Sequence, residues 1–156
     1  MNTDQIIKRL KEGNERYVAD KLNHPLQDHA RRVELTKGQQ PHTIVLSCAD
    51  SRVVPELAFD TGLGELFVVR VAGNIANTSS MASIEYAVAH CGSKVIVVLG
   101  HESCGAVTAA VAGGDNGYNL KTVPVLFGIK LSNYIGVFLM IVGISYLFFL
   151  GINNII

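Results

Sequence analysis

Two short segments of the sequence carry side chains whose types and spacing could bind a metal ion. Cys48 and Asp50 directly follow the apolar run TIVLS, and His101 and Cys104 directly follow the apolar run KVIVVLG. Two thiolates, an imidazole and a carboxylate are all donors that Zn2+ accepts in tetrahedral geometry. Structural zinc sites usually use four Cys or His ligands and a C-x-x-C knuckle, and a carboxylate is the most exchangeable of these donors. The pattern therefore predicts a zinc site and favours a catalytic one, the alternatives being a structural zinc or two unrelated loops.

Three apolar runs must position these segments. Residues 43–47, 66–71 and 94–100 are rich in β-branched side chains and too continuously apolar for half-exposed strands. They predict buried strands of a parallel sheet. Helix-like stretches separate the runs, VPELAFDTG and SSMASIEYAVAHCG, and this alternation is typical of an α/β fold with helices flanking a mainly parallel central sheet. Because ligands gather at the carboxyl ends of such strands, we expect both metal-binding segments at one edge of the sheet.

The remaining segments complete a single domain over residues 1–156. Residues 3 to about 19 predict an amphipathic helix capped by Asn2 or Thr3, and a polar stretch follows to Pro41. These residues form an N-terminal helical arm, 1–40. A core with the zinc site spans 41–115 and ends in a short helix, CGAVTAAVAGG. An atypical apolar tail covers 116–156.

Composition narrows the function classes. Lys plus Arg and Asp plus Glu number 13 each, so no basic surface indicates nucleic acid binding. Three cysteines are an odd number, and thiols in a reducing compartment serve as ligands or packing rather than disulfides. The first residues carry scattered charges and no apolar stretch of signal-peptide length. These features predict a cytoplasmic protein.

Four motifs carry a resemblance to a known family. CADSRV, FVVRVAGN, SIEYAV and VLGHESCGAV, in this order and spacing, closely resemble the motifs of β-class carbonic anhydrases, and the similarity runs from about Gly13 to Ala112. The resemblance implies an α/β fold and a lyase that reversibly hydrates carbon dioxide to bicarbonate and a proton by zinc-bound hydroxide. It also implies a homodimer or larger homo-oligomer with active sites at the subunit interface.

The resemblance assigns roles to the residues of the metal site. Cys48, His101 and Cys104 match the three constant zinc ligands of the family. Asp50 and Arg52 match a pair in which the acid either closes the fourth position on zinc or pairs with the arginine and leaves room for water. A bidentate arginine–carboxylate pair is strong enough to hold the acid away.

Three more positions match substrate-binding residues of one branch of the family. Gln39 aligns with a glutamine that donates to the substrate oxygen, Tyr86 with a pocket tyrosine, and Gly105 with a glycine whose backbone N–H meets the bound anion. Without the family, these residues would be assigned to loop solvation, helix packing and a helix start. The RVAGN segment aligns with a loop lining the site, with Gly73 allowing close backbone approach. The chain has no tryptophan, so the inhibitory bicarbonate site of another branch is not expected.

The tail departs from the family pattern after about Gly113, and no charged residue follows Lys130. GVFLMIVGISYLFFLGI resembles the last strand of the family, which is the interpretation we favour. Residues 131–152 are also long and apolar enough to span a bilayer, or the chain could be a damaged product with an exposed core. The alternatives to a hydratase are therefore a non-hydrating zinc-binding paralogue or a degenerate, membrane-tethered relative. An enzyme acting on carbon disulfide or carbonyl sulfide would keep the same ligands.

Overall fold

A computed structural model describes residues 1–112, 137–141 and 147–150 of the protein. Its strands form one sheet in the order β2-β1-β3-β4-β5. β1, β2 and β3 are parallel, β4 is antiparallel to β3, and β5 is antiparallel to β4. The bounds are Thr43–Ser47 for β1, Leu66–Arg70 for β2, Val95–Leu99 for β3, Val137–Ile141 for β4 and Leu147–Leu150 for β5.

The three parallel strands are in step. Ser47, the last residue of β1, pairs with Arg70 of β2 and Leu99 of β3, which end those strands. All five residues of β1 are buried, which explains its unbroken apolar sequence. The predicted α/β fold with a mainly parallel sheet is confirmed, and the segments that follow β1, β2 and β3 leave the sheet at one edge.

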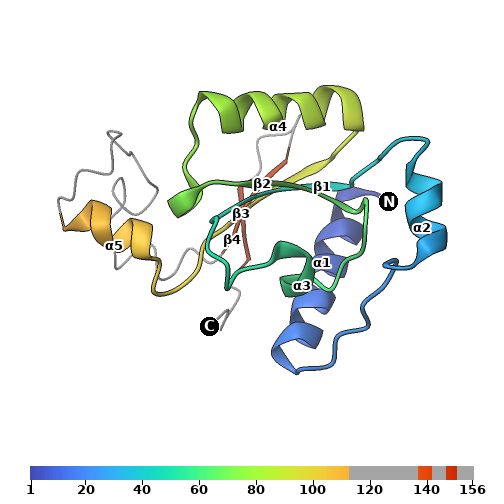
Figure 1. The fold of residues 1–156 in the computed structure, drawn as a ribbon, viewed down its shortest axis with the longest axis horizontal. Coiled ribbons are helices and arrows are strands. Elements are labelled where there is room, and N and C mark those ends of the chain that lie inside the picture. Colours follow the sequence, from blue (N-terminus) through green and yellow to red (C-terminus); the bar gives the residue numbers. More distant parts are fainter. Residues whose placement is uncertain (113–136, 142–146, 151–156) are drawn as a thin grey trace.

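Helices cover both faces of this sheet (Figure 1), with α4 on one face and α1 and α3 on the other. Ile84 and Ala87 of α4 pack against alternate strand residues such as Ile44. Ile6 and Leu10 of α1 pack against the opposite set. The helices are α1 (Thr3–Val18), α2 (His29–Leu35), α3 (Pro55–Ala58), the 3-10 helix η1 (Ala72–Asn74), α4 (Thr78–Cys91) and α5 (Gly105–Val111).

Local sequence explains how α1 starts and packs. Asn2 and Gln5 form a reciprocal capping box at its first turn. Leu10 and Gly13 lie on the buried face, and a Cβ added at Gly13 would stand 1.8 Å from the Phe59 carbonyl oxygen. Glycine therefore lets α1 approach the end of α3 closely.

The structure adds α2 to the predicted elements. The Asp28 side chain caps this helix by accepting from the Arg31 backbone N–H at 2.8 Å. The helix has seven residues and none of them is buried, so it needs no continuous apolar face and is too short for an apolar period to indicate it.

Only part of the apolar tail lies within the described residues. In the interval 131–152, the structure describes 137–141 and 147–150, and both are strands. Within the described part of the chain, no helix has the length and apolar character needed to cross a membrane. The expectations for 113–136, 142–146 and 151–156 lie outside the described residues.

Candidate metal centre

Three of the four predicted ligands converge where β1 and β3 end. Cys48 follows β1, His101 follows β3, and Cys104 precedes α5 as its N-cap. One ligand atom from each lies within 4.8 Å of the others, and the two Sγ atoms are 3.8 Å apart. Both cysteines are buried, and the His101 side chain is only 3 % exposed. Two loops distant in sequence thus form one compact, buried donor set.

The His101 ring is oriented as a metal ligand. Its Nδ1 lies 2.9 Å from the Glu102 carbonyl oxygen, so Nδ1 carries the proton and donates to it. Nε2 is then left with its lone pair, buried and without a hydrogen-bond partner in the described structure. Leaving a buried nitrogen unpaired is costly, and coordination would remove that cost. Two thiols and this nitrogen fit zinc in both ligand type and number.

Backbone N–H groups surround the Cys48 sulfur. Sγ accepts from the N–H of Asp50 at 3.4 Å and from that of Gly73 at 3.3 Å. For Cys104, burial raises the pKa of the thiol and the nearby Cys48 adds to the increase, although backbone N–H groups of α5 oppose it. Because a thiol must lose its proton to coordinate, metal uptake here would release protons.

Asp50 is paired with Arg52 rather than grouped with the other predicted ligands. Arg52 donates from Nε to Oδ1 at 2.9 Å and from Nη2 to Oδ2 at 2.8 Å. These side-chain bonds, with a further bond from the Arg52 backbone N–H, hold the pKa of the Asp50 carboxyl well below its usual range. Oδ2 nevertheless lies only 3.9 Å from His101 Nε2. The acid therefore stands beside the cluster, ionised and held by the arginine.

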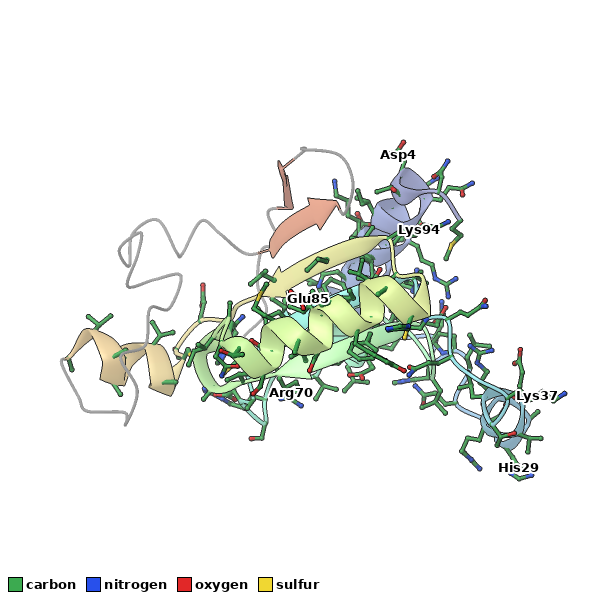
Figure 2. The ribbon with its side chains drawn as sticks, turned by 90° about the horizontal axis from the view of Figure 1, so that it is seen from above. Asp4, His29, Lys37, Arg70, Glu85 and Lys94 are labelled. Atoms are coloured by element: carbon green, nitrogen blue, oxygen red, sulfur yellow. The ribbon has the colours of Figure 1, made fainter. Side chains whose placement is uncertain are left out.

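The predicted substrate-binding residues fall at two places. Gly105 begins α5 directly after Cys104, so it lies at the cluster, and it is exposed. Gln39 instead precedes β1 and lines a surface cavity with Lys94, which precedes β3. Figure 2 labels Lys94 and Arg70, at opposite ends of the parallel strands. A five-residue strand spans about 16 Å, so Gln39 is not brought to the cluster within one chain.

Tyr86 lies on the same side as Gln39. Its ring centroid is 5.1 Å from that of His90, which lines the same cavity, and 6.2 Å from that of Phe67, in the first half of β2. Tyr86 is 51 % exposed. Its role, like that of Gln39, stays a prediction.

The structure also shows contacts that sequence reasoning missed. Arg70 donates to three carbonyl oxygens of the loop after β1, and Asn74 donates to the Leu99 carbonyl at the end of β3. An arginine at a strand end is ordinarily solvated, so nothing in the sequence indicated the first contact. Gly-Asn after a strand is a signal for a left-handed turn, and Gly73 and Asn74 have φ of 71° and 56°.

Comparisons with known proteins agree with this geometry. The sequence model of the family described as "Carbonic anhydrase" matches residues 43–126. A protein named Carbonic anhydrase 2 from Mycobacterium tuberculosis is 52% identical over 118 residues, covering 74% of this chain and 57% of that protein. Carbonic anhydrase from Mycolicibacterium smegmatis is 50% identical over 110 residues, covering 70% of this chain and 53% of that one. The chain thus spans a little over half the length of these curated relatives.

Solved structures show the same architecture. The tetrameric β-carbonic anhydrases from the ascomycete Sordaria macrospora match with a TM-score of 0.52 and 30% identity, over 76% of this chain and 58% of theirs. The β-carbonic anhydrase CcaA matches with a TM-score of 0.51 and 34% identity, over 69% of this chain and 50% of its own. With the family match over more than half of its residues and a relative that is half identical, this chain belongs to the β-carbonic anhydrase family.

Proposed function

We propose that this chain is a zinc-dependent carbonic anhydrase, which interconverts carbon dioxide and water with bicarbonate and a proton. The observation that carries the proposal is the buried convergence of Cys48, His101 and Cys104, with His101 Nε2 left unpaired. The names of the curated relatives support the same activity.

The residues of the centre have two roles in this proposal: some would hold the metal, and others would keep one coordination position open. Cys48, His101 and Cys104 would hold zinc, which when bound acidifies water and so supplies the nucleophile for carbon dioxide. Arg52 binds both oxygens of Asp50 and keeps this carboxylate from occupying the remaining position. The same Nη2 of Arg52 also donates to the Ser103 carbonyl at 3.1 Å, which fixes the guanidinium between the two loops.

A second copy of the chain would complete the substrate pocket. Gln39 and Tyr86 lie away from the cluster of their own chain, so they can act only on the cluster of a neighbouring copy. The relatives from Sordaria macrospora are described as tetrameric, which supports a homo-oligomer. A cytoplasmic location remains a prediction from the cysteines and the charged first residues.

The decisive experiment combines metal analysis with a stopped-flow carbon dioxide hydration assay on the purified chain. We expect about one zinc per chain and hydration that depends on it. Cys104→Ser should lose both. Cys91→Ser is the matched control, because Cys91 is equally buried but lies outside the donor set. A parent chain with zinc and no hydration would be a zinc-binding paralogue, and a Cys104→Ser chain with full zinc would remove this ligand set.

A further inference from the structure

We propose that Arg70 and Asn74 are positioning residues of the metal centre. They tie the ligand loop after β1, and the end of β3 that leads into the other ligand loop, to the short segment 70–74. This segment begins at the last residue of β2 and contributes no ligand itself. This inference rests on the proposed function for the identity of the metal, and it concerns how the ligands are held in place.

Arg70 holds the loop after β1. Its Nε donates to the Cys48 carbonyl at 3.0 Å, and its Nη2 donates to the carbonyls of Asp50 at 2.6 Å and Val53 at 2.9 Å. The planar guanidinium suits such divergent acceptors because its N–H groups point in fixed directions. Figure 2 labels this side chain at the end of β2. One arginine thus fixes the backbone of a zinc ligand and of the neighbouring acid.

Asn74 holds the end of β3, which leads into the other ligand loop. Its Nδ2 donates to the carbonyl oxygen of Leu99, two residues before His101. Its backbone has a φ of 56°, a left-handed conformation that asparagine tolerates better than most residues, and its N–H donates to the Val71 carbonyl at 3.0 Å. The turn therefore aims the amide at β3 and anchors the chain just before the histidine ligand.

Gly73 lies between these anchors and reaches the metal ligand itself. It is buried, has a φ of 71°, and donates its backbone N–H to Cys48 Sγ at 3.3 Å. Arg70 therefore holds the carbonyl of Cys48 while the same segment contacts its sulfur. A donor placed on a thiolate takes up part of its negative charge, so this segment affects both the placement of the ligand and its electron donation.

These contacts are made to backbone carbonyls and to the Cys48 sulfur at the carboxyl edge of the sheet. Val53 and Leu99 also bury their side chains in the apolar core, but the hydrogen bonds go to their backbone oxygens and not to those apolar side chains. Removing Arg70 or Asn74 should consequently loosen the metal more than it weakens the fold. Mutation of residues that hydrogen-bond to metal ligands commonly lowers metal affinity or activity by 10- to 100-fold.

The test compares Arg70→Lys and Asn74→Asp with the parent chain, using cobalt(II) as the metal. Lysine keeps the positive charge of Arg70 but lacks the planar guanidinium that donates to several carbonyls at once. Aspartate keeps the size of Asn74 and tolerates its left-handed backbone conformation, but it lacks the amide N–H donor. Arg32→Lys and Asn77→Asp are matched controls. Arg32 donates to one carbonyl away from the site, and Asn77 caps α4 through an oxygen that aspartate retains.

Three measurements are made on each full-length chain. They are the thiolate-to-cobalt absorption, the rate of cobalt release to a chelator, and thermal unfolding of the metal-free chain. We expect altered absorption and about tenfold faster release in both site variants, with near-parental unfolding and parental behaviour of the controls.

Parental release and absorption in the site variants would overturn the inference. So would metal-free unfolding far below the parent in both, because the residues would then serve the fold in general. A parent chain that shows no thiolate-to-cobalt absorption would instead overturn the proposed function.

Discussion

In the function proposed here, the chemistry of the metal centre depends on one ion pair, between Asp50 and Arg52. The guanidinium donates to both carboxylate oxygens, and this keeps the pKa of Asp50 far below its ordinary value. The Asp50 carboxyl is therefore ionised throughout the neutral range, so protonation does not prevent it from binding a metal ion. With its Oδ2 3.9 Å from His101 Nε2, it is kept off only by the arginine.

Replacing Arg52 should consequently block the coordination position that water needs while leaving the metal bound. In Arg52→Ala, we expect parental zinc content and a loss of hydration of about tenfold or more, because the freed carboxylate can occupy the position needed by water. The measurements are zinc analysis and stopped-flow hydration, with the exposed Arg32→Ala as control. A variant that hydrates carbon dioxide at the parental rate would show that the pair has no such role.

At the scale of elements, Asp60 connects α1, α3 and the loop after α1. It lies just after α3 with a side chain only 1 % exposed, and it accepts from Arg16 of α1 and from the backbone N–H groups of Asn23 and His24. Burial alone would raise the pKa of this carboxyl, but the bonds from these donors outweigh burial and lower it. Its contribution to stability is therefore fully present above the unfolded-state pKa, and it is lost as the pH falls through the folded-state pKa.

The substitution Asp60→Asn tests how much these hydrogen bonds to the Asp60 carboxylate contribute to stability. Asparagine keeps the size and tolerates the φ of 45°, but it replaces an ionised acceptor. At neutral pH we expect a loss of about 2 kcal/mol in the free energy of unfolding, moderated by the one-third exposure of Arg16. Urea unfolding checks this, and the difference from the parent should shrink below about pH 4. The exposed Asp20→Asn serves as control, and equal stability of Asp60→Asn and parent at neutral pH would contradict the assignment.

At the scale of the molecule, two of the three predicted substrate residues, Gln39 and Tyr86, lie toward the opposite end of the parallel strands from the metal cluster. Gln39 shares its cavity with residues before β1 and β3, whereas the ligands follow those strands. An oligomer in which each pocket combines residues of two copies would explain both placements. Closed, symmetric assemblies are the usual form of such homo-oligomers.

Mixing two defective variants tests this arrangement. His101→Ala removes a ligand and Gln39→Ala a substrate contact, so each variant alone should hydrate carbon dioxide poorly. Co-expressed in equal amounts, half of the dimers would be mixed, and each mixed dimer would hold one pocket with both residues intact. We expect recovery to about a quarter of the parental rate. Activity no higher than the average of the two variants would place Gln39 outside a shared pocket.

Residue types alone predicted a four-residue donor set and the sheet that presents it, and the structure brings three of these residues together. The run at 43–47 coincides with β1 because a strand buried on both faces needs continuous apolar sequence, and this signal is local. Cys48, His101 and Cys104 could be grouped in advance because parallel strands in step bring the segments after them to one edge. For the same reason, the mainly parallel α/β fold was predictable.

The tertiary structure decided which partner each polar side chain takes. Asp50 could have joined the cluster or paired with Arg52, and the placement of the guanidinium against the Ser103 carbonyl settles its position here. The contacts of Arg70 and Asn74, and the distance of Gln39 from the cluster, also depend on residues far away in sequence. Such contacts leave no periodicity in the chain, because a hydrogen bond between distant segments needs only one donor and one acceptor at the right place.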